Sequence, residues 1–307
     1  MPEIQHKPAE PTTVRNGNIR VPVLSAAMDE AAFGYPRDFL GNQFVYLVIS
    51  PRAGGLSIGV NINPAMKCSF RCLYCEVDRH QPARAAHLDV NRMAAELDET
   101  LALVYSPKLR QLSRYAKMSD ALLQVRHVAL SGDGEPTLAE NFAEAVREIN
   151  HLRVRGGIPF FKIVLVTNST ALDRPQVREA LKFFKHGDEI WAKLDGGTQA
   201  YLNRLNGATT PIEKILDNIL ATARQRPVVI QSLFPAIDGE EPPADEIQQY
   251  AQRLKELKSA GAEISSVQIY SATRPMAKTG CSHLPLKTLS QIAQTVRQTA
   301  GLRAEVF

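Results

Sequence analysis

Three of the chain's four cysteines fall within one short segment, Lys67-Cys68-Ser69-Phe70-Arg71-Cys72-Leu73-Tyr74-Cys75, at a C-x3-C-x2-C spacing. Thiolates on such closely spaced loops bind iron–sulfur clusters. A [4Fe–4S] cluster takes four ligands and this loop supplies three, so one iron is left for a ligand from outside the chain. An open coordination position is where metal sites act on a bound molecule. The motif therefore predicts that Cys68, Cys72 and Cys75 are metal ligands within a catalytic centre.

Zinc is the main alternative for these cysteines, with His80, Cys281 or His283 as a fourth ligand. Soft thiolates suit zinc as well as iron. Structural zinc sites usually combine two C-x2-C pairs, however, and the sequence has no second pair. The spacing thus favours an iron–sulfur cluster, and Cys281 alone is interpreted as a small buried or loop residue.

Strand-like and helix-like patterns alternate around this loop. A hairpin of two strands, at 44–50 and 56–62, precedes it. Downstream strands are expected at 125–130, 161–167, 189–194, 228–234 and 264–270, and helices at 89–105, 140–151, 174–185, 211–224, 243–260 and 285–299. Such alternation predicts a parallel sheet covered by helices. About six strand–helix units are too few for a closed eightfold barrel, so we expect an α/β fold, a partial (βα)6 barrel with an N-terminal β-hairpin extension.

The chain divides by pattern into an N-terminal arm, residues 1–42, and one core domain, residues 43–307. The arm contains several prolines and has weak periodicity, with a short helix expected near 25–33. In the core, the connection 76–124 has room for two helices, and its segment 108–117 is basic. A surface insertion with a solvated basic face is favoured there over a lid above the substrate or a nucleic-acid contact.

The composition and charge of the chain exclude several classes of protein. Hydrophobic residues make up 44% of the chain and charged residues 22%, which is ordinary for a globular protein. The net charge of +4 is too mild to indicate a nucleic-acid-binding protein. No apolar run approaches the roughly 20 residues of a membrane helix, and the N-terminus lacks the apolar core of a signal peptide. Clustered cysteines suit a reducing compartment, so a cytoplasmic location is expected.

Polar residues follow the predicted strands at their carboxyl ends, where parallel α/β sheets bind ligands. One strand runs into Ser131-Gly132-Asp133-Gly134-Glu135, whose glycines let a ligand approach the backbone and whose glutamate offers a carboxylate to an ammonium group. Later strand ends carry Asn168, Lys193 and Asp195, which we expect to contact a cofactor or substrate. Further polar residues in or just after strands are Gln231, Gln268, Tyr270 and Arg274.

The cysteine loop, its position after a strand and the Gly134-Glu135 turn resemble the radical S-adenosylmethionine (SAM) superfamily. The resemblance implies that SAM chelates the fourth iron and is cleaved by an electron from the cluster, giving a 5′-deoxyadenosyl radical that removes hydrogen from a substrate. Tyr74 occupies the aromatic position that packs against the adenine in that family. Gly134 and Glu135 match the element that binds the amino group of SAM, and Lys193 is expected to bind its carboxylate.

A narrower resemblance covers roughly residues 43–275. The order of the segments 52–61, 68–75, 131–138, 166–168 and 194–195 is similar to the wyosine-synthase-related branch of Fe–S oxidoreductases. In the tRNA-modifying members of that branch, upstream cysteines hold a second cluster. This chain has no cysteine before Cys68, so we expect a single-cluster enzyme that does not carry out the wyosine reaction.

The expected function is hydrogen abstraction from an unidentified substrate, with a tRNA base and a peptide as candidates. The resemblance also implies a flavodoxin- or ferredoxin-like electron donor, whose acidic surface would meet Lys67, Arg71 and Arg79. The alternative is a non-catalytic iron–sulfur or zinc-binding redox module, which would not cleave SAM. Two interpretations are open for the basic residues after the cysteine loop: an RNA-binding surface, and an ordinary solvated face, which is favoured. These residues are Arg79, His80, Arg84, Lys108, Arg110, Arg114 and Lys117.

Overall fold

The structure is a computed structural model that describes residues 13–16, 19–22, 39–50, 52–272 and 280–307. The short helix expected near 25–33 and Arg274 both lie outside the described residues. Near the N-terminus, β1 (Thr13–Asn16) pairs in an antiparallel manner with β2 (Ile19–Pro22). The functional argument therefore concerns the part of the chain from residue 39 onward.

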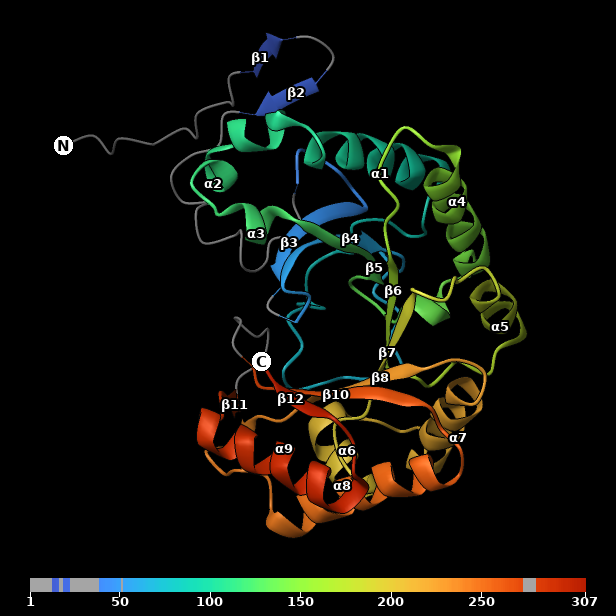
Figure 1. The fold of residues 1–307 in the computed structure, drawn as a ribbon, viewed down its shortest axis with the longest axis vertical. Helices are drawn as coiled ribbons and strands as arrows, with labels where there is room; N and C mark the ends of the chain where they lie inside the picture. The colour runs from blue at the N-terminus through green and yellow to red at the C-terminus, as the bar shows by residue number, and fades with distance from the viewer. Residues whose placement is uncertain (1–12, 17–18, 23–38, 51, 273–279) are drawn as a thin grey trace, which may run out of the picture.

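An eight-stranded sheet forms the centre of the molecule (Figure 1). Six of its strands are parallel and neighbours in chain order: β4 (Gly55–Asn61), β5 (Val125–Ser131), β6 (Ile163–Thr167), β7 (Glu189–Lys193), β8 (Val228–Leu233) and β10 (Ile264–Tyr270). At one edge β3 (Val45–Ser50) pairs with β4 in an antiparallel manner, and at the other β12 (Ala304–Val306) pairs with β10 in a parallel manner. In the described residues these two edges do not pair, which confirms the predicted partial barrel with an N-terminal hairpin.

Helices follow the strands and lie on the outer side of the curved sheet (Figure 1). They are α1 (Val90–Val104), α4 (Phe142–Arg155), α5 (Pro175–Leu181), α6 (Gln199–Asn206), α7 (Ile212–Ala223), α8 (Ala244–Ser259) and α9 (Leu286–Ala300). Helix α1 begins as expected after Asp89, whose side chain accepts a hydrogen bond from the backbone N–H of Arg92 at 3.0 Å. The short elements that were not predicted include α6, β12, the β1–β2 pair, and the pair formed by β9 (Ala236–Ile237) and β11 (Cys281–Ser282).

The long connection before β5 contains short helices, as its length predicted. They are the 3₁₀ helix η2 (Pro107–Gln111), α2 (Ser113–Ala116) and α3 (Asp120–Leu123). Lys108 and Lys117 are exposed there, but Arg110 donates to the carboxylate of Asp120 and to the carbonyl of Met118, and Arg114 is buried. The segment therefore presents a weaker positive surface than its composition indicates.

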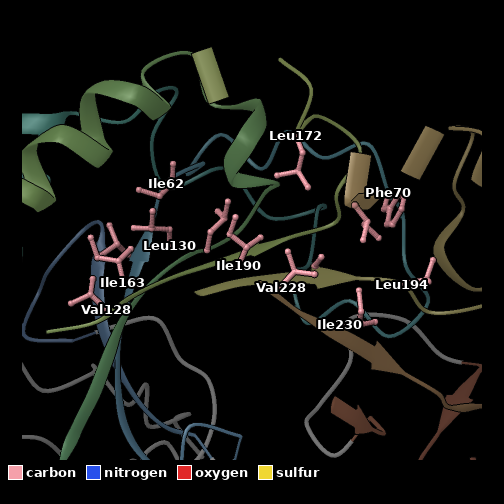
Figure 2. Close-up of a cluster of buried hydrophobic side chains, with 14 of the residues drawn as sticks. Ile62, Phe70, Val128, Leu130, Ile163, Leu172, Ile190, Leu194, Val228 and Ile230 are labelled. Atoms are coloured by element: carbon pink, nitrogen blue, oxygen red, sulfur yellow. The ribbon is translucent and has the colours of Figure 1, made fainter. Parts of the chain in front are cut away.

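The main core lies between the sheet and its helices. Strand residues such as Val128, Leu130, Ile163, Ile190 and Ile230 are completely buried there (Figure 2). Each side chain of this size stabilises the fold by about 1.5–3 kcal/mol on burial. A second, smaller cluster consists of Val164, Trp191 and Val229. Parallel strands buried on both faces have nearly continuous apolar runs, which is what these strands show.

None of the described helices combines the length and the apolar character needed to cross a membrane.

Candidate active site

A cavity of about 320 Å³ lies between the strands of the sheet and the cysteine loop. Its wall includes Cys68, Tyr74 and Cys75 from that loop and Gly132, Asp133 and Gly134 from the end of β5. Deeper along the strands it includes the following side chains: Tyr46, Ser57, His127, Trp191, Lys193, Gln231 and Tyr270. Each of the six strands β4, β5, β6, β7, β8 and β10 thus contributes to one space beside the thiols.

The cysteine loop is fixed by backbone hydrogen bonds at both of its ends. At one end, the carbonyl of Lys67 accepts from the N–H of Glu135 at 2.9 Å and from the side-chain amide of Asn63 at 2.9 Å. At the other end, the N–H groups of Arg71 and Leu73 donate to the last turn of α6, at 2.7 and 2.8 Å. The loop is therefore attached both to the β5 turn and to a helix that follows β7.

The Sγ atoms of Cys68 and Cys72 accept hydrogen bonds from N–H groups of the chain. Cys68 Sγ accepts from the backbone N–H of Phe70 at 3.4 Å and from Nδ2 of Asn168 at 3.6 Å. Cys72 Sγ accepts from Nδ2 of Asn206 at 3.3 Å. Burial, followed by the nearby charge of Asp195, raises the pKa of Cys72 to about 12, and burial also raises the pKa of Cys68. A positively charged group bound to these sulfurs would offset that penalty on the thiolate form.

The spacing of the potential ligands bears on which metal group fits. Within the described ranges, no three His, Cys, Asp or Glu side chains are grouped as ligands of one metal ion. Thiolates around a single zinc ion would lie about 3.8 Å apart, as follows from tetrahedral Zn–S bonds of about 2.3 Å. A four-iron cluster separates its thiolates further because each binds a different iron. Three thiols that are not grouped around one ion, two of them with N–H donors, therefore fit a cluster better than zinc.

The turn after β5 requires glycine at two positions. Gly132 has φ of +133°, and a Cβ there would lie 2.1 Å from Oδ1 of Asn61. A Cβ on Gly134 would lie 2.5 Å from the carbonyl oxygen of Lys67. Real Cβ atoms do not approach this closely, so glycine allows the turn to pack directly against the cysteine loop. The cavity wall at this point is consequently backbone.

Glu135 lies behind that wall, only 3% exposed. Its Oε1 accepts from the hydroxyls of Thr137 and Thr167, both at 2.6 Å, and its Oε2 accepts from the backbone N–H of Asn168 at 2.7 Å. Burial raises the pKa of Glu135, although these donors oppose the shift. The carboxylate thus joins the ends of β5 and β6, and its predicted contact with an ammonium group stays a prediction.

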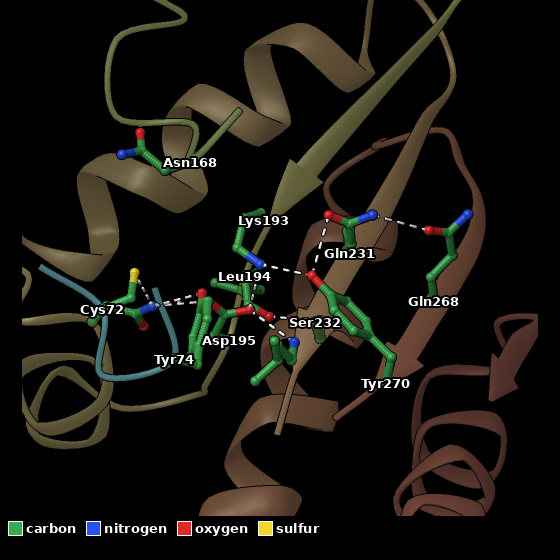
Figure 3. A network of polar contacts seen from close by, with 12 residues as sticks. Cys72, Tyr74, Asn168, Lys193, Leu194, Asp195, Gln231, Ser232, Gln268 and Tyr270 are labelled. Carbon is green, nitrogen blue, oxygen red and sulfur yellow. Dashed lines mark hydrogen bonds and ion pairs between the residues drawn. The ribbon is translucent and has the colours of Figure 1, made fainter. Parts of the chain in front are cut away.

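A second buried carboxylate organises the other side of the cavity (Figure 3). Asp195, 1% exposed, accepts from the hydroxyl of Tyr74, from Nδ2 of Asn206 at 2.8 Å and from the N–H of Leu233 at 2.9 Å. It also pairs with Nζ of Lys193 at 3.3 Å. Burial alone would lower the pKa of Lys193, but Asp195 and Tyr270 outweigh it and raise that pKa. Lys193 is therefore a fixed cation on the cavity wall.

Tyr270 continues this network across the barrel. Lys193 Nζ donates to the hydroxyl of Tyr270 at 3.1 Å, and that hydroxyl donates to Oε1 of Gln231 at 3.3 Å. Gln231 in turn donates to Oε1 of Gln268 at 3.2 Å (Figure 3). The guanidinium carbon of Arg52 lies 4.2 Å from the centroid of the Tyr270 ring. One wall of the cavity is thus a continuous row of polar side chains.

The deeper part of the cavity contains a histidine that is held neutral. His127 is 2% exposed, forms a hydrogen bond of 2.9 Å with Ser57, and packs edge-on against Trp191 with ring centroids 5.3 Å apart. Burial, then the charges of Lys162 and Arg52, lowers the pKa of His127 to about 3. This residue type and position were not singled out from the sequence.

The site residues predicted from the sequence fall into two groups: some line the cavity, and others are buried behind its wall. Tyr74, Gly134 and Lys193 line the cavity together with Cys68 and Cys75. The buried residues Glu135, Asn168 and Asp195 lie behind the wall and hold the residues that form it. Their contact with a cofactor stays a prediction.

Sequence reasoning missed Asn206, whose amide donates to Cys72, Tyr74 and Asp195 at once. It belongs to α6, the helix that was not expected. An Asn followed by Gly207 at the end of a short amphipathic segment after Thr198 was the available signal, because these residues cap the helix at its two ends.

Comparison with known families shows a match to the model described as the Radical SAM superfamily over residues 62–251. Among curated proteins, the UPF0026 protein slr1464 of Synechocystis sp. is 33% identical over 178 residues, which are 57% of this chain and 56% of that protein. The chain therefore spans little more than half the length of this relative.

Solved structures share the fold at low identity. SuiB of Streptococcus suis bound to S-adenosylmethionine has a TM-score of 0.55 and 15% identity, with 80% of this chain and 49% of that chain covered. TYW1 with a lysine-pyruvate adduct has a TM-score of 0.51 and 16% identity, with 95% and 87% covered. These likenesses concern the arrangement of the sheet and its helices.

Proposed function

This chain belongs to the radical SAM superfamily, whose members bind a [4Fe–4S] cluster and SAM, and on that premise we propose that the cavity is a radical SAM active site. Cys68, Cys72 and Cys75 are the proposed cluster ligands. When bound, the cluster and SAM supply reductive cleavage of SAM to methionine and a 5′-deoxyadenosyl radical. The observation that carries the proposal is the contact between the cysteine loop, the Gly134 turn and the cavity.

The chain's own residues have separate tasks in this proposal. Phe70, Asn168 and Asn206 donate N–H groups to the sulfurs and so stabilise negative charge on them. Lys193 faces the cavity as a cation and would bind the carboxylate of SAM. The backbone at Gly132 and Gly134 is open to the amino group, and Tyr74 offers a ring beside Cys75 for the adenine.

The two buried carboxylates are proposed as positioning residues. Glu135 holds the β5 and β6 ends together, so it fixes the Gly134 turn against the cysteine loop. Asp195 fixes both Lys193 and Tyr74 in the orientation that faces the cavity. The strands that surround the cavity limit its contact with water, which protects a reactive radical from side reactions. We place this active core in residues 43–307 and treat residues 1–42 as an arm.

The test is cofactor cleavage by anaerobically reconstituted protein. With dithionite and SAM, the chain is expected to show the visible absorbance of an iron–sulfur cluster and to release 5′-deoxyadenosine. Cys72→Ala should lose both, because it removes one cluster ligand. Cys281→Ala is the matched control, since Cys281 lies in β11 and should leave both unchanged. A colourless zinc protein, or a cluster-loaded protein that releases no 5′-deoxyadenosine, would contradict the proposal.

An acidic electron donor of the flavodoxin or ferredoxin class is proposed to dock beside the cysteine loop. Arg71 and Arg79 are exposed there, and the side chain of Lys67 is 62% exposed next to Glu140. Complementary charge raises the rate of encounter, most strongly at low salt. Charge reversal at Lys67 and Arg71, whose side chains do not line the cavity, should slow donor-driven turnover but leave dithionite-driven turnover intact. Equal donor-driven rates at low salt would remove this docking proposal.

The hydrogen donor is proposed to be a tRNA base or a peptide. Lys108 and Lys117 are exposed in the basic segment, whereas Arg110 is hydrogen-bonded within the chain and Arg114 is buried. Binding of tRNA that weakens steeply with salt would favour the RNA candidate, because displaced counterions accompany each phosphate contact. Binding that is absent or insensitive to salt would favour the peptide.

A further inference from the structure

Arg52 is the feature of the cavity that the proposed function leaves unused. It lies in the turn between β3 and β4, lines the cavity and is partly buried. Its Nε is buried and has no hydrogen-bond partner among the described residues. Its guanidinium carbon lies over the ring of Tyr270, 4.2 Å from the centroid. The side chain thus reaches from the first barrel strand's hairpin to the end of the last barrel strand, β10.

The charges around Tyr270 do not balance. Two cations lie within 6 Å of its ring centroid, Arg52 at 4.2 Å and Lys193 at 5.4 Å. Asp195 pairs with Lys193, but within the described ranges Arg52 forms no ion pair. Even partial burial of a cation without a partner carries a desolvation cost, and a ligand that brings a negative charge would offset that cost. The cavity therefore has room for one anionic group beside Arg52.

We propose that Arg52 binds an anionic group, a carboxylate or a phosphate, of the substrate. The proposal rests on the proposed function and adds the chemical class of the substrate. The guanidinium fork suits planar, bidentate contact with either group. The ring of Tyr270 holds the guanidinium in place by a cation–π contact, which leaves its edge for the ligand.

Arg52 and Lys193 both lie over the Tyr270 ring, 4.2 and 5.4 Å from its centroid, so the two cations belong to one part of the cavity. Their other contacts distinguish them, because Lys193 pairs with Asp195 and Arg52 has no ion pair among the described residues. Lys193 is the cation that faces the cysteine loop: its Nζ is 5.1 Å from the ring centroid of Tyr74, and Figure 3 shows it between Tyr74 and Tyr270. Lys193 is thus placed for the cofactor and Arg52 for the molecule beyond it.

The experiment is anaerobic equilibrium dialysis of the cluster-loaded full chain, in saturating SAM, against labelled inorganic phosphate and labelled propionate. The wild-type chain should bind one equivalent of one probe; preference for phosphate indicates a phosphate ester substrate and preference for propionate a carboxylate. Arg52→Gln should weaken that binding at least about tenfold, because charge-assisted hydrogen bonds are lost. Its affinity for SAM should stay unchanged.

Two further variants keep the test decisive. Arg178→Gln removes one exposed charge on α5 and should bind the probe like the wild type. Arg52→Lys keeps the charge and should bind the probe with intermediate affinity, and circular dichroism checks the fold of each variant. Undiminished binding by Arg52→Gln, equal weakness of Arg52→Lys, or a parallel loss of SAM affinity would overturn the inference. A wild-type chain that releases 5′-deoxyadenosine but binds neither probe overturns this inference alone; one that releases none overturns the proposed function as well.

Discussion

Single atoms decide the shape of the site at Gly134. Its α-carbon packs so closely against the cysteine loop that even one methyl group has no space, and the neighbouring atoms are the backbone carbonyl of Lys67 and the amide of Asn63. That carbonyl is also held by the N–H of Glu135, so it cannot move away without breaking a hydrogen bond. The shape of the site at this point is therefore set by the packing of backbone atoms and not by a side chain of residue 134.

Gly134→Ala is therefore expected to weaken SAM binding and to lower the free energy of unfolding by about 1–3 kcal/mol through overpacking. Calorimetric titration with SAM and urea unfolding would measure the two effects. Gly187→Ala is the matched control, since a Cβ at Gly187 meets no atom within 4 Å. A Gly134→Ala chain with wild-type SAM affinity would show that the two loops can separate without consequence for the site.

His127 should make stability depend on pH. Its pKa is about 3 in the folded chain, because of burial, and about 6.5 when unfolded, so below pH 6.5 the unfolded state binds more protons. Stability from this residue is complete above that pH and is lost as the pH falls toward 3. At about pH 5.5 the loss is about 1.4 kcal/mol.

Urea unfolding at neutral pH and at about pH 5.5 measures this loss. His127→Gln should lose less stability between the two pH values than the wild type, whereas the exposed His186→Gln should behave like the wild type. Identical pH dependence in His127→Gln and the wild type would mean that the histidine is protonated in the folded chain.

At the scale of elements, a buried glutamate joins α1 to the sheet edge. Glu96, 7% exposed, accepts from the backbone N–H groups of Gln43, Phe44 and Val45 at 2.8–3.2 Å and from Arg92 at 2.9 Å. These N–H groups lie at the start of β3, so the helix supplies acceptors where the edge strand begins. Strand β3 in turn carries Tyr46 to the cavity.

Glu96→Gln should lower the free energy of unfolding by about 1.5–3 kcal/mol, because hydrogen bonds to a charged acceptor are stronger than those to an amide. Chemical unfolding measures this value. Glu99→Gln on the exposed face of the same helix should change stability by less than about 0.5 kcal/mol. A neutral result for Glu96→Gln would show that solvent replaces the lost contacts at this edge.

The sequence predicted the long elements well and the short ones poorly. Strand β10 matches its prediction at both ends because its β-branched and aromatic residues lie between Gly261 upstream and Ser271 downstream. Helix α6 was missed because its eight residues follow Gly196-Gly197, which read as a loop, yet Glu246 on α8 accepts hydrogen bonds from Gly197 and Thr198 and so stabilises its start. That contact joins residues far apart in the chain and leaves no local pattern.

The same distinction applies to the site. Lys193 is the last residue of β7, so its place at the carboxyl end of the sheet was predictable from chain order. Ser57, His127 and Trp191 lie inside the strands, where both faces are buried and periodicity does not tell the barrel interior from the helix-covered face. Arg52 lies between two strands in a segment whose glycines and proline already predict a turn, so the sequence offers no further reason to single it out. Its contact with Tyr270 is visible only in the three-dimensional structure.

At the scale of the whole molecule, ligand binding and folding should be linked. The cysteine loop contacts the turn after β5 on one side and α6 on the other, so a group that binds there links segments that are far apart in the sequence. A ligand that binds only the folded state stabilises it by about 2.7 kcal/mol at 100 times its dissociation constant.

SAM at that excess should therefore raise the unfolding free energy of the cluster-loaded chain by about this amount. It should stabilise the cluster-free chain much less, since the cluster supplies part of the binding site. Thermal or urea unfolding of both forms, with and without SAM, provides the measurement. Equal stabilisation of the two forms would place the SAM site away from the cysteines.

Trp191 gives the molecule one more property. It is the chain's single tryptophan, and it lies on the cavity wall against His127. Its ultraviolet emission therefore comes from one known point inside the barrel. An iron–sulfur cluster bound in the same cavity would quench that emission by energy transfer. The intrinsic fluorescence of the unlabelled protein would therefore report the occupancy of the site.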